Sequence, residues 1–397
     1  MGFVAPAGTP LSLGDLARGA ARSASSATIV QLRRGLSAAG GRRRAWLAST
    51  ARAAMPRALP AMKQASGEPR RVEVIFAGYT CYSVPASIQR AGLVPRICDV
   101  DPATLSLDFD SLAGVDLGRV LAIVSANLYG LPNALEEIES LAHQAGLFMV
   151  DDAAQALGAR YRERPAGNFG DVGLFSFDKG KNITTLQGGV LVADTGRFSD
   201  ELDAVMNSLR DVRPTGIPAT LAKLPVYALL LRPWAYGLVR HLPIGLGLTP
   251  WDVDYPLEPY SPALAGLAAV QLDRLAAING TRIANAERLR AALMDVPGVT
   301  LPRVLPGAVP VYARFPMLVD ADRRADVIAR LERAGIGATV SYPRALIDVP
   351  EVAARLPADQ RPTPGAREVA SRIVTLPTHG YAPPGMAARV RDALFRT

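Results

Sequence analysis

The sequence has few of the residues from which metal sites and disulfide frameworks are built. Its 397 residues include three histidines and two cysteines. His143, His241 and His379 lie far apart, so their spacing predicts no histidine-based metal site. Cys81 and Cys98 lie in apolar, strand-like surroundings. Two cysteines in so long a chain indicate buried, reduced thiols in a cytoplasmic protein rather than a disulfide framework.

The sequence also lacks a long uninterrupted apolar run. Its most apolar stretch, "KLPVYALLLRPWAYGLVRHLPIGLGLTPW", lies within residues 207–260 and is interrupted by Pro225, Arg232 and Pro233. A membrane-spanning helix needs about 20 predominantly apolar residues. Residues 223–250 are therefore expected to form a helical hairpin packed on the protein or at a subunit interface, with a peripheral membrane contact as the alternative. The N-terminal "MGFVAPAGTPLSLGDL" lacks a basic start followed by an apolar core, so no secretory signal is predicted.

Acidic residues are fewer than basic residues, 36 against 44. The resulting net charge of +8, with a pI near 9.7, raises the question of a nucleic-acid partner. The arginines are mostly scattered among Ala and Leu, and the one dense run is Arg42, Arg43 and Arg44. A solvated basic helix face is expected there. A patch that attracts phosphate-bearing small molecules is the alternative. No nucleic-acid partner is predicted.

What the sequence does contain is the pattern of a packed α/β protein. The apolar fraction is 49% and the charged fraction is 20%, as in globular domains. From about residue 73, short apolar runs such as "VEVIFAG", "LAIVSANLYG" and "LFMVDD" alternate with helical stretches such as "ALEEIESLAHQAG". This alternation predicts an α/β fold with a mainly parallel sheet that helices cover on both faces.

The pattern also suggests three segments along the chain. We expect a basic N-terminal segment over 1–47, a large domain over 48–295 that includes the apolar insert 207–260, and a small C-terminal α+β domain over 296–397. One long helix is predicted over 261–295. In the small domain, strand-like "VYARFPMLVD" and "ATVSY" flank helical "RRADVIARLERAG".

Polar residues gather where two of the predicted strands end. Asp151 and Asp152 close "LFMVDD", Gln155 follows one turn later, Ser176 lies in "LFSF", and Lys181 follows in the next loop. The carboxyl ends of parallel strands meet at one edge of a sheet. An acid and a lysine there suit pyridoxal phosphate, because the amine forms a Schiff base with the aldehyde and the carboxylate keeps the pyridine nitrogen protonated. Each residue alone also has a structural explanation, as a helix cap or a solvated loop residue.

Two stretches of the sequence then resemble a known family. "VDDAAQALGARY" and "GNFGDVGLFSFDKGKNITTLQGG" are similar to the DegT/DnrJ/EryC1/StrS family of sugar aminotransferases, whose members read approximately "EDAAQAHGA…GSFGDIGCFSFHPTKNLTTGEGG". Weaker similarity covers most of the chain from about residue 48. The resemblance implies the pyridoxal-phosphate-dependent transferase fold of type I, like that of aspartate aminotransferase. It also implies pyridoxal 5′-phosphate as the cofactor, bound by the domain 48–295, and a homodimer.

The resemblance implies a role for each residue of the motif. Lys181 falls on the Schiff-base lysine, whereas Lys179 falls in the variable pair before it. Asp152 falls on the partner of the pyridine nitrogen. Gln155 falls on the residue that contacts the cofactor ring near its 3′-oxygen. Ser176 falls on a hydroxyl that binds the cofactor phosphate.

A second motif is expected to complete the phosphate site. "ASTARAAM" at 48–55 resembles the family's "SSGTAAL", in which hydroxyl and N–H groups at a helix N-terminus hold phosphate. Thr50, Ala51 and Arg52 would belong to this phosphate cup. Because Ala51 replaces the usual glycine, the turn there must avoid positive φ.

Other positions depart from the family pattern. Cys81 stands where an aromatic ring normally stacks on the pyridine, and Tyr79 or Tyr82 is expected to substitute for that ring. The remaining departures are Asn127 in place of His, Leu257 in place of an Asn that reaches the neighbouring subunit's phosphate, and Ser341 in place of His.

The resemblance implies an aminotransferase that moves an amino group from an amino acid, with glutamate as the expected donor, to a keto sugar. The sugar is expected to be nucleotide-linked and to serve polysaccharide or glycoside biosynthesis. One alternative is a pyridoxal-phosphate-dependent dehydratase or other lyase of the same family. The family's dehydratases carry His at the lysine position, so Lys181 argues against it. The other alternative is a non-catalytic homologue that binds the cofactor, which the intact set of Asp152, Gln155, Ser176 and Lys181 argues against.

Overall fold

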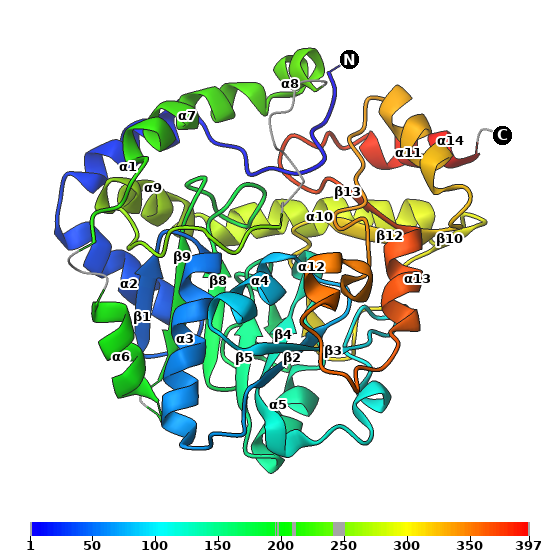
Figure 1. Ribbon diagram of the computed structural model, residues 1–397. Helices are drawn as coiled ribbons and strands as arrows, with labels where there is room; N and C mark the ends of the chain where they lie inside the picture. The colour runs from blue at the N-terminus through cyan, green and yellow to red at the C-terminus, as the bar shows by residue number, and fades with distance from the viewer. Residues whose placement is uncertain (1, 195, 197, 209–211, 241–250, 396–397) are drawn as a thin grey trace.

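A seven-stranded sheet forms the centre of the computed structural model, which describes residues 2–194, 196, 198–208, 212–240 and 251–395 (Figure 1). Across the sheet the strands are β1 (Arg44–Ala48), β9 (Gly189–Ala193), β8 (Val172–Ser176), β5 (Phe148–Asp152), β4 (Val120–Ala126), β2 (Glu73–Ala77) and β3 (Val94–Cys98). The pairs from β8 to β3 are parallel, and β9 runs antiparallel to both β8 and β1. The predicted mainly parallel sheet is confirmed.

Helices cover both faces of this sheet, which explains why its strands are continuous apolar runs. Every residue of β2, β4, β5, β8 and β9 is buried. The helices before residue 300 are α1 (Leu13–Ser23), α2 (Ala27–Ala39), α3 (Ala51–Ser66), α4 (Ser83–Arg90), α5 (Leu135–Gln144), α6 (Ser199–Asn207), α7 (Ile217–Leu230), α8 (Pro233–Val239), α9 (Pro262–Leu272) and α10 (Leu275–Leu293). Short 3-10 turns are η1 (Phe109–Leu112), η2 (Leu117–Arg119), η3 (Leu128–Gly130) and η4 (Leu346–Asp348).

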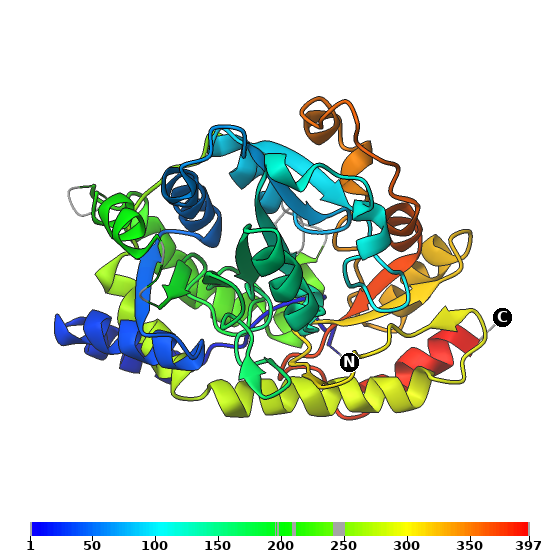
Figure 2. The same cartoon turned by 90° about the horizontal axis from the view of Figure 1, so that it is seen from below.

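The last hundred residues contribute a second, smaller sheet. It consists of β10 (Val299–Thr300), β12 (Phe315–Val319) and β13 (Ile373–Leu376), all antiparallel. With it are α11 (Arg324–Arg333), α12 (Pro350–Ala353), α13 (Pro364–Arg372) and α14 (Met386–Phe395). A third small sheet joins β11 (Ala308–Val309), β6 (Arg160–Tyr161) and β7 (Arg164–Pro165). Figure 2 shows α10 as a long helix along one edge of the molecule.

Two expected elements differ from the structure. The helix predicted over 261–295 is divided into α9 and α10 at Asp273 and Arg274. Both residues form ion pairs of 2.6 Å with α1, Asp273 with Arg22 and Arg274 with Asp15. The strand expected in "ATVSY" is reduced to one bridge between Thr339 and Thr375.

The end of the expected N-terminal segment, residues 44–47, belongs to the large sheet. The boundary expected at 47/48 falls inside β1. The basic run lies on the turn after α2 and the start of β1, not on a helix face. Arg42 donates to the carbonyl of Gly170 at 2.7 Å and pairs with Asp194, and Arg44 pairs with Asp203. One apolar core runs from the central sheet into the C-terminal elements. The expected domain ranges stay predictions.

Residues 2–11, which we call the N-terminal strap, cross the molecule as a buried extended segment. The Phe3 N–H donates to the Pro233 carbonyl, and the Val4 N–H donates to the Gly335 carbonyl, both at 2.9 Å. The His379 Nε2 contacts the Ala5 carbonyl at 2.9 Å. The strap therefore joins the apolar insert to the C-terminal elements.

The apolar insert forms α7 and α8, which follow one another instead of forming the expected hairpin (Figure 1). Leu224, Tyr227 and Tyr236 pack against the protein. Residues 241–250 of the expected insert lie outside the described residues. Of the helices that the structure describes, none is both long enough and apolar enough to cross a membrane.

Stability should depend on pH through His379. The ring is buried, its Nε2–H donates to the Ala5 carbonyl, and its Nδ1 accepts from the Tyr381 N–H, so it is neutral when folded. Burial lowers the pKa of His379 from 6.5 to about 4. Between these values the unfolded chain binds more protons, so the folded state loses stability as pH falls. The free energy of unfolding of wild type minus that of His379→Gln should be about 3 kcal/mol larger at pH 7 than at pH 4.

Urea unfolding at the two pH values measures this difference. The control is the same comparison with His143→Gln, since His143 is exposed on α5. A difference for His379→Gln that stays constant across this range would contradict the linkage.

Candidate active site

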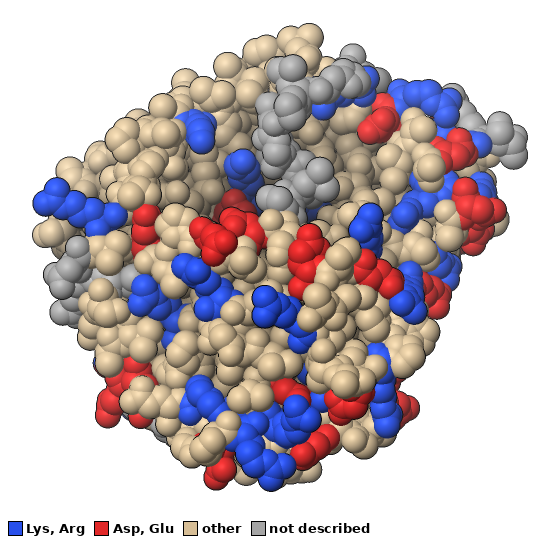
Figure 3. All heavy atoms as spheres, in the orientation of Figure 1, with Lys and Arg blue, Asp and Glu red and all other residues tan. Residues whose placement is uncertain are grey.

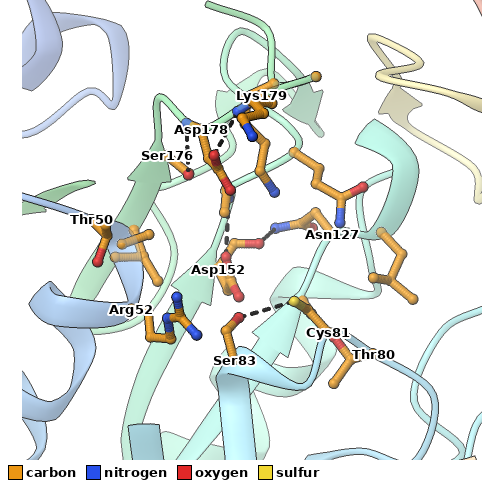
Figure 4. Close-up of a pocket in the computed structure, with 18 of the residues that line it drawn as sticks. Thr50, Arg52, Thr80, Cys81, Ser83, Asn127, Asp152, Ser176, Asp178 and Lys179 are labelled. Carbon is orange, nitrogen blue, oxygen red and sulfur yellow. Dashed lines mark hydrogen bonds between the residues drawn. The ribbon is translucent and has the colours of Figure 1, made fainter. Parts of the chain in front are cut away.

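A cavity of about 430 Å³ lies where β4, β5 and β8 end and α3 begins (Figure 4). Its wall includes Asp152 from β5, Ser176 from β8 and Lys181 from the loop after β8. The register of β5 with β8 sets Asp152 opposite Leu174, so the strand ends are adjacent. As expected, these residues therefore lie together at the carboxyl edge of the sheet.

The two acids at the end of β5 point to opposite sides of the sheet. The Asp151 carboxylate accepts from the N–H of Gly167 at 2.6 Å and from the Asn127 side-chain amide at 2.7 Å. It is fully buried and does not line the cavity. Asp152 lines the cavity, and its carboxylate accepts from the Ala154 N–H at 3.0 Å. Asp151 is thus a structural residue, and Asp152 is the acid available to a ligand.

Charge and burial also separate the two lysines, although both line the cavity. Lys179 is exposed and Lys181 is half-buried. Burial raises the pKa of the Asp152 carboxyl, and the Ala154 N–H and the charge of Lys181 act in the opposite direction. The electrostatic partner of Asp152 is therefore Lys181, the lysine predicted from the sequence.

Buried polar groups of the strap, α9 and α10 hydrogen bond to the backbone of the loop that contains Lys181. The Lys181 carbonyl accepts from the Thr9 hydroxyl of the strap and from the Arg282 guanidinium of α10, the latter at 3.2 Å. Gln271 of α9 makes two hydrogen bonds with the backbone of Thr184, at 2.9 and 2.7 Å. The backbone of this buried loop thereby finds partners outside its own motif, as buried peptide groups require.

The expected phosphate cup is a helix N-terminus. Thr50 caps α3, and its side chain accepts from the Ala53 N–H at 2.9 Å. Ala51 begins α3, so it has the helical, negative φ expected for it. The double glycine of "TTLQGG" packs here, since a Cβ on Gly189 would lie 2.2 Å from the Ala51 nitrogen. Glycine is needed at that position because the loop and the helix start touch through their backbones.

Further polar groups face the same cavity. Arg52 lines it beside Thr50 (Figure 4), and its guanidinium lies 4.7 Å from the centre of the Tyr255 ring. Thr80 lines the cavity too, and its hydroxyl is buried without a hydrogen-bond partner among the residues that the structure describes. A buried hydroxyl of this kind indicates that a polar ligand group completes its hydrogen bonding.

The expected ring substitutes do not line the cavity. Tyr79 is buried in the core, where its hydroxyl donates to the Val340 carbonyl at 3.0 Å, and Tyr82 packs on the Tyr342 ring. Cys81 itself lies in the wall, together with the rings of Tyr129 and Tyr342. Tyr129 and Tyr342 were missed from the sequence, although "LYG" and "VSYP" contain them.

Gln155 hydrogen bonds to both Tyr129 and Tyr342. Its side-chain oxygen accepts from the Tyr129 N–H at 3.1 Å, and its amide donates to the Tyr342 hydroxyl at 3.3 Å. Asn127, which replaces the family's His, has a local role. Its side-chain amide donates both to the Asp151 carboxylate and to the Asp152 carbonyl. Leu257 does not line the cavity, and its carbonyl accepts from Arg57.

Three non-glycine residues among the described lining of the cavity have left-handed backbone conformations. The φ angles are 59° for Tyr129, 64° for Leu186 and 59° for Ser341. Such conformations cost non-glycine residues on the order of 1–3 kcal/mol and cluster at functional sites. Leu186 stands where the family pattern "TTGEGG" has glycine, so this left-handed position carries a side chain here.

The sheet order and the lysine and acid at its carboxyl edge define a transferase fold of type I. A family model described as the DegT/DnrJ/EryC1/StrS aminotransferase family matches residues 25–213 and 262–395. The chain belongs to this family, which confirms the resemblance, the fold class and pyridoxal phosphate as the cofactor of the fold.

Among curated relatives, the chain is 32% identical over 263 residues to the dTDP-4-dehydro-2,6-dideoxy-D-glucose 3-dehydratase of Saccharopolyspora spinosa, covering 63% of this chain and 53% of the relative. It is 36% identical over 138 residues to the GDP-perosamine synthase of Caulobacter vibrioides, covering 35% of this chain and 36% of the relative. It is 26% identical to the dTDP-3-amino-3,4,6-trideoxy-alpha-D-glucose transaminase of Streptomyces venezuelae, covering 81% and 75%. The chain thus spans about half the length of the first of these relatives and about a third of the second.

Solved structures share the fold. The Helicobacter pylori aminotransferase PseC superposes with a TM-score of 0.79 at 17% identity, covering 100% of this chain and 99% of that one. The Streptomyces venezuelae protein DesV gives 0.75 at 24% identity, covering 98% and 97%.

The structural role of Asp151 predicts a second pH dependence, opposite in sign to that of His379. Burial raises the pKa of the Asp151 carboxyl from 3.8 to about 6, against the opposing effect of the Gly167 N–H and the Asn127 amide. Between these values only the folded state keeps the proton, so stability falls as pH rises. The free energy of unfolding of wild type minus that of Asp151→Asn should therefore shrink by about 3 kcal/mol from pH 4 to pH 7.

Urea unfolding across this range checks the sign, with exposed Asp110→Asn as the matched control. A difference that grows with pH would show that Asp151 is ionised and stabilising, contrary to this account.

Proposed function

We propose that the chain is an aminotransferase that moves an amino group from an amino acid, with glutamate as the expected donor, to the keto group of a nucleotide-linked sugar. The observation that carries the proposal is the presence of Lys181 and Asp152 in the wall of one cavity. The printed names of two relatives, a transaminase for a dTDP-linked amino sugar and a GDP-perosamine synthase, support this substrate class.

The residues of the cavity fit pyridoxal phosphate. A phosphate suits the α3 N-terminus beside Thr50 and Ser176, where helix dipole and N–H groups favour an anion. The Thr80 hydroxyl lacks a partner and offers one more donor. Asp152 offers a buried carboxylate to a protonated ring nitrogen, which would favour the charged form of both groups. Lys181 offers an amine to the aldehyde.

When bound, the cofactor supplies an aldehyde that condenses with amines and a ring that takes up electrons from the substrate carbon. The part of the protein is to place protons and charges. The Lys181 Nζ takes a proton from the donor carbon and returns one to the acceptor carbon as a general base and acid. The Asp152 carboxylate holds the proton on the ring nitrogen. Gln155, which hydrogen bonds to the Tyr129 N–H and the Tyr342 hydroxyl, would contact the side of the ring.

Arg314 supports an amino-acid donor. Its guanidinium lines the cavity and donates to the Ser341 hydroxyl at 3.1 Å. No carboxylate of the described residues lies within ion-pair distance of it. An arginine with this geometry suits the bidentate binding of a carboxylate, which every α-amino acid carries.

The relative from Saccharopolyspora spinosa favours a second candidate, a sugar dehydratase. Lys181 argues against it, because the family's dehydratases carry histidine at this position. Mass spectrometry of a keto sugar nucleotide incubated with glutamate separates the two, since transamination adds nitrogen and dehydration removes water. The expected homodimer and the cytoplasmic location stay predictions.

The cofactor should be attached covalently to Lys181. Borohydride reduction of the loaded protein, followed by peptide mapping, should place a pyridoxyl group on the Lys181 Nζ. Lys181→Ala should abolish the adduct, whereas the matched variant Lys179→Ala should retain it, because Lys179 is exposed and Asp152 couples to Lys181. A pyridoxyl group on Lys179 would refute the assignment.

Replacing the ring-nitrogen partner should slow the chemistry but leave loading intact. Asp152→Asn removes the anion that stabilises the protonated ring, so the half-reaction with glutamate should slow by a factor on the order of 100 or more. Stopped-flow absorbance of the cofactor measures this rate. Asp151→Asn is the neighbouring control and should keep a rate close to that of wild type. Wild-type speed in Asp152→Asn would mean that Asp152 has another role.

A further inference from the structure

The two long segments of the chain outside the match to the family model are residues 1–24 and 214–261. Their described parts pack on one another. The Phe3 N–H donates to the Pro233 carbonyl at 2.9 Å, and the Phe3 and Tyr236 rings lie 5.9 Å apart. The Thr9 N–H donates to the Tyr227 hydroxyl at 2.9 Å. The N-terminal strap, α1, α7 and α8 therefore form one structural unit outside the matched ranges.

The outer side of α7 and α8 is apolar, unlike that of an ordinary surface helix. One side of the pair packs inward through Leu224, Tyr227 and Tyr236. Exposed on the other side are Leu221 (41%), Val226 (52%), Leu229 (48%), Trp234 (59%) and Leu238 (78%), which we call the α7–α8 apolar face. In Figure 3, uncharged atoms dominate the upper left of the molecule, where α7 runs in Figure 1. Concentrated exposure of this kind marks an interaction site.

The charged residues of α7, α8 and the turn between them are all basic. They are Lys223 and Arg232, and neither helix contains Asp or Glu. Glu332 of α11 lies near Tyr236 of α8. The acids of the same segment come after residue 251 and are Asp252, Asp254 and Glu258. The α7–α8 apolar face is thus flanked within its own helices by Lys223 and Arg232.

We infer that the α7–α8 apolar face docks on the surface of a lipid bilayer that contains anionic lipid. Five large apolar side chains would enter the interfacial region, and Lys223 and Arg232 would lie against the headgroups. Trp234 is of the residue type enriched at that depth. The helices would lie in the plane of the interface, since no helix among the described residues is fit to cross it.

The charge pattern favours lipid over a second copy of the chain. A two-fold contact sets each patch against itself, so Lys223 and Arg232 would face the same basic residues of the second copy. Like charges placed together in this way cost free energy, whereas anionic headgroups complement them.

The docking helices also touch the wall of the active site. Tyr227 contacts Thr9, whose hydroxyl donates to the Lys181 carbonyl. Thr220 of α7 donates to the side-chain oxygen of Gln187 at 3.4 Å, and Gln187 lines the cavity. A docked protein would therefore hold its catalytic loop close to the membrane surface.

Flotation of the full-length, cofactor-loaded protein with vesicles tests this inference. Wild type should float with vesicles of phosphatidylcholine and phosphatidylglycerol in equal parts, and less with phosphatidylcholine alone or at high salt. The double variant Trp234→Gln and Leu238→Gln should bind the mixed vesicles about tenfold or more weakly, because it removes two of the five inserted side chains. The matched control, Met294→Gln with Val309→Gln, removes two equally exposed apolar side chains elsewhere and should bind as wild type does.

Three results would overturn the inference. One is a wild type that fails to float with the mixed vesicles at low salt. Another is an equal loss of binding in the control variant. The third is a wild-type dimer that the Trp234 and Leu238 variant converts to monomer in light scattering, which would assign the face to a second copy. The rate of the half-reaction with glutamate in the same variants should not change, so failure of docking and failure of the proposed aminotransferase function are distinguishable.

Discussion

The parallel pairing of β5 with β8 is the contact on which the rest of the site depends. Its register sets Asp152 opposite Leu174, so that Ser176 ends at the same edge and the following loop returns Lys181 to the cavity. Side chains alternate along a strand, and a slip of one residue would turn Asp151 to the cavity and Asp152 into the core. The burial of both sheet faces makes that slip costly, and the hydrogen bonds that Asp151 accepts from Gly167 and Asn127 oppose it further.

The same site depends on contacts from the far side of the Lys181 loop. Thr9, Gln271 and Arg282 come from the strap, α9 and α10, and each hydrogen bonds to the backbone of that loop. The arrangement is rigid where chemistry needs a fixed amine. It also explains why the strained backbone at Leu186 persists in the wall, since the contacts to the preceding residues of the loop hold it in place.

Much of this could be predicted from sequence because the signals are local. Apolar runs separated by helical periods indicate a buried parallel sheet, and strand ends then bring Asp152, Ser176 and Lys181 to one edge. The misses have a common cause. Tyr79 and Tyr82 neighbour Cys81 in the sequence, but the direction in which each side chain points depends on the packing around it. The helix predicted over 261–295 is broken where α1 packs, and no local pattern records that contact.

By itself, then, the sequence determined the fold class, the family and which residues could serve as lysine and acid, because these follow from periodicity and from a gapless motif. Tertiary structure alone decided three other things. It decided that Asp151 is structural, that Tyr129 and Tyr342 form the aromatic wall, and that the N-terminal strap and the insert form one unit with an apolar outer face. Each of these depends on segments far apart in the chain meeting in space, and contacts of that kind are set by packing and by the need of buried polar groups for partners.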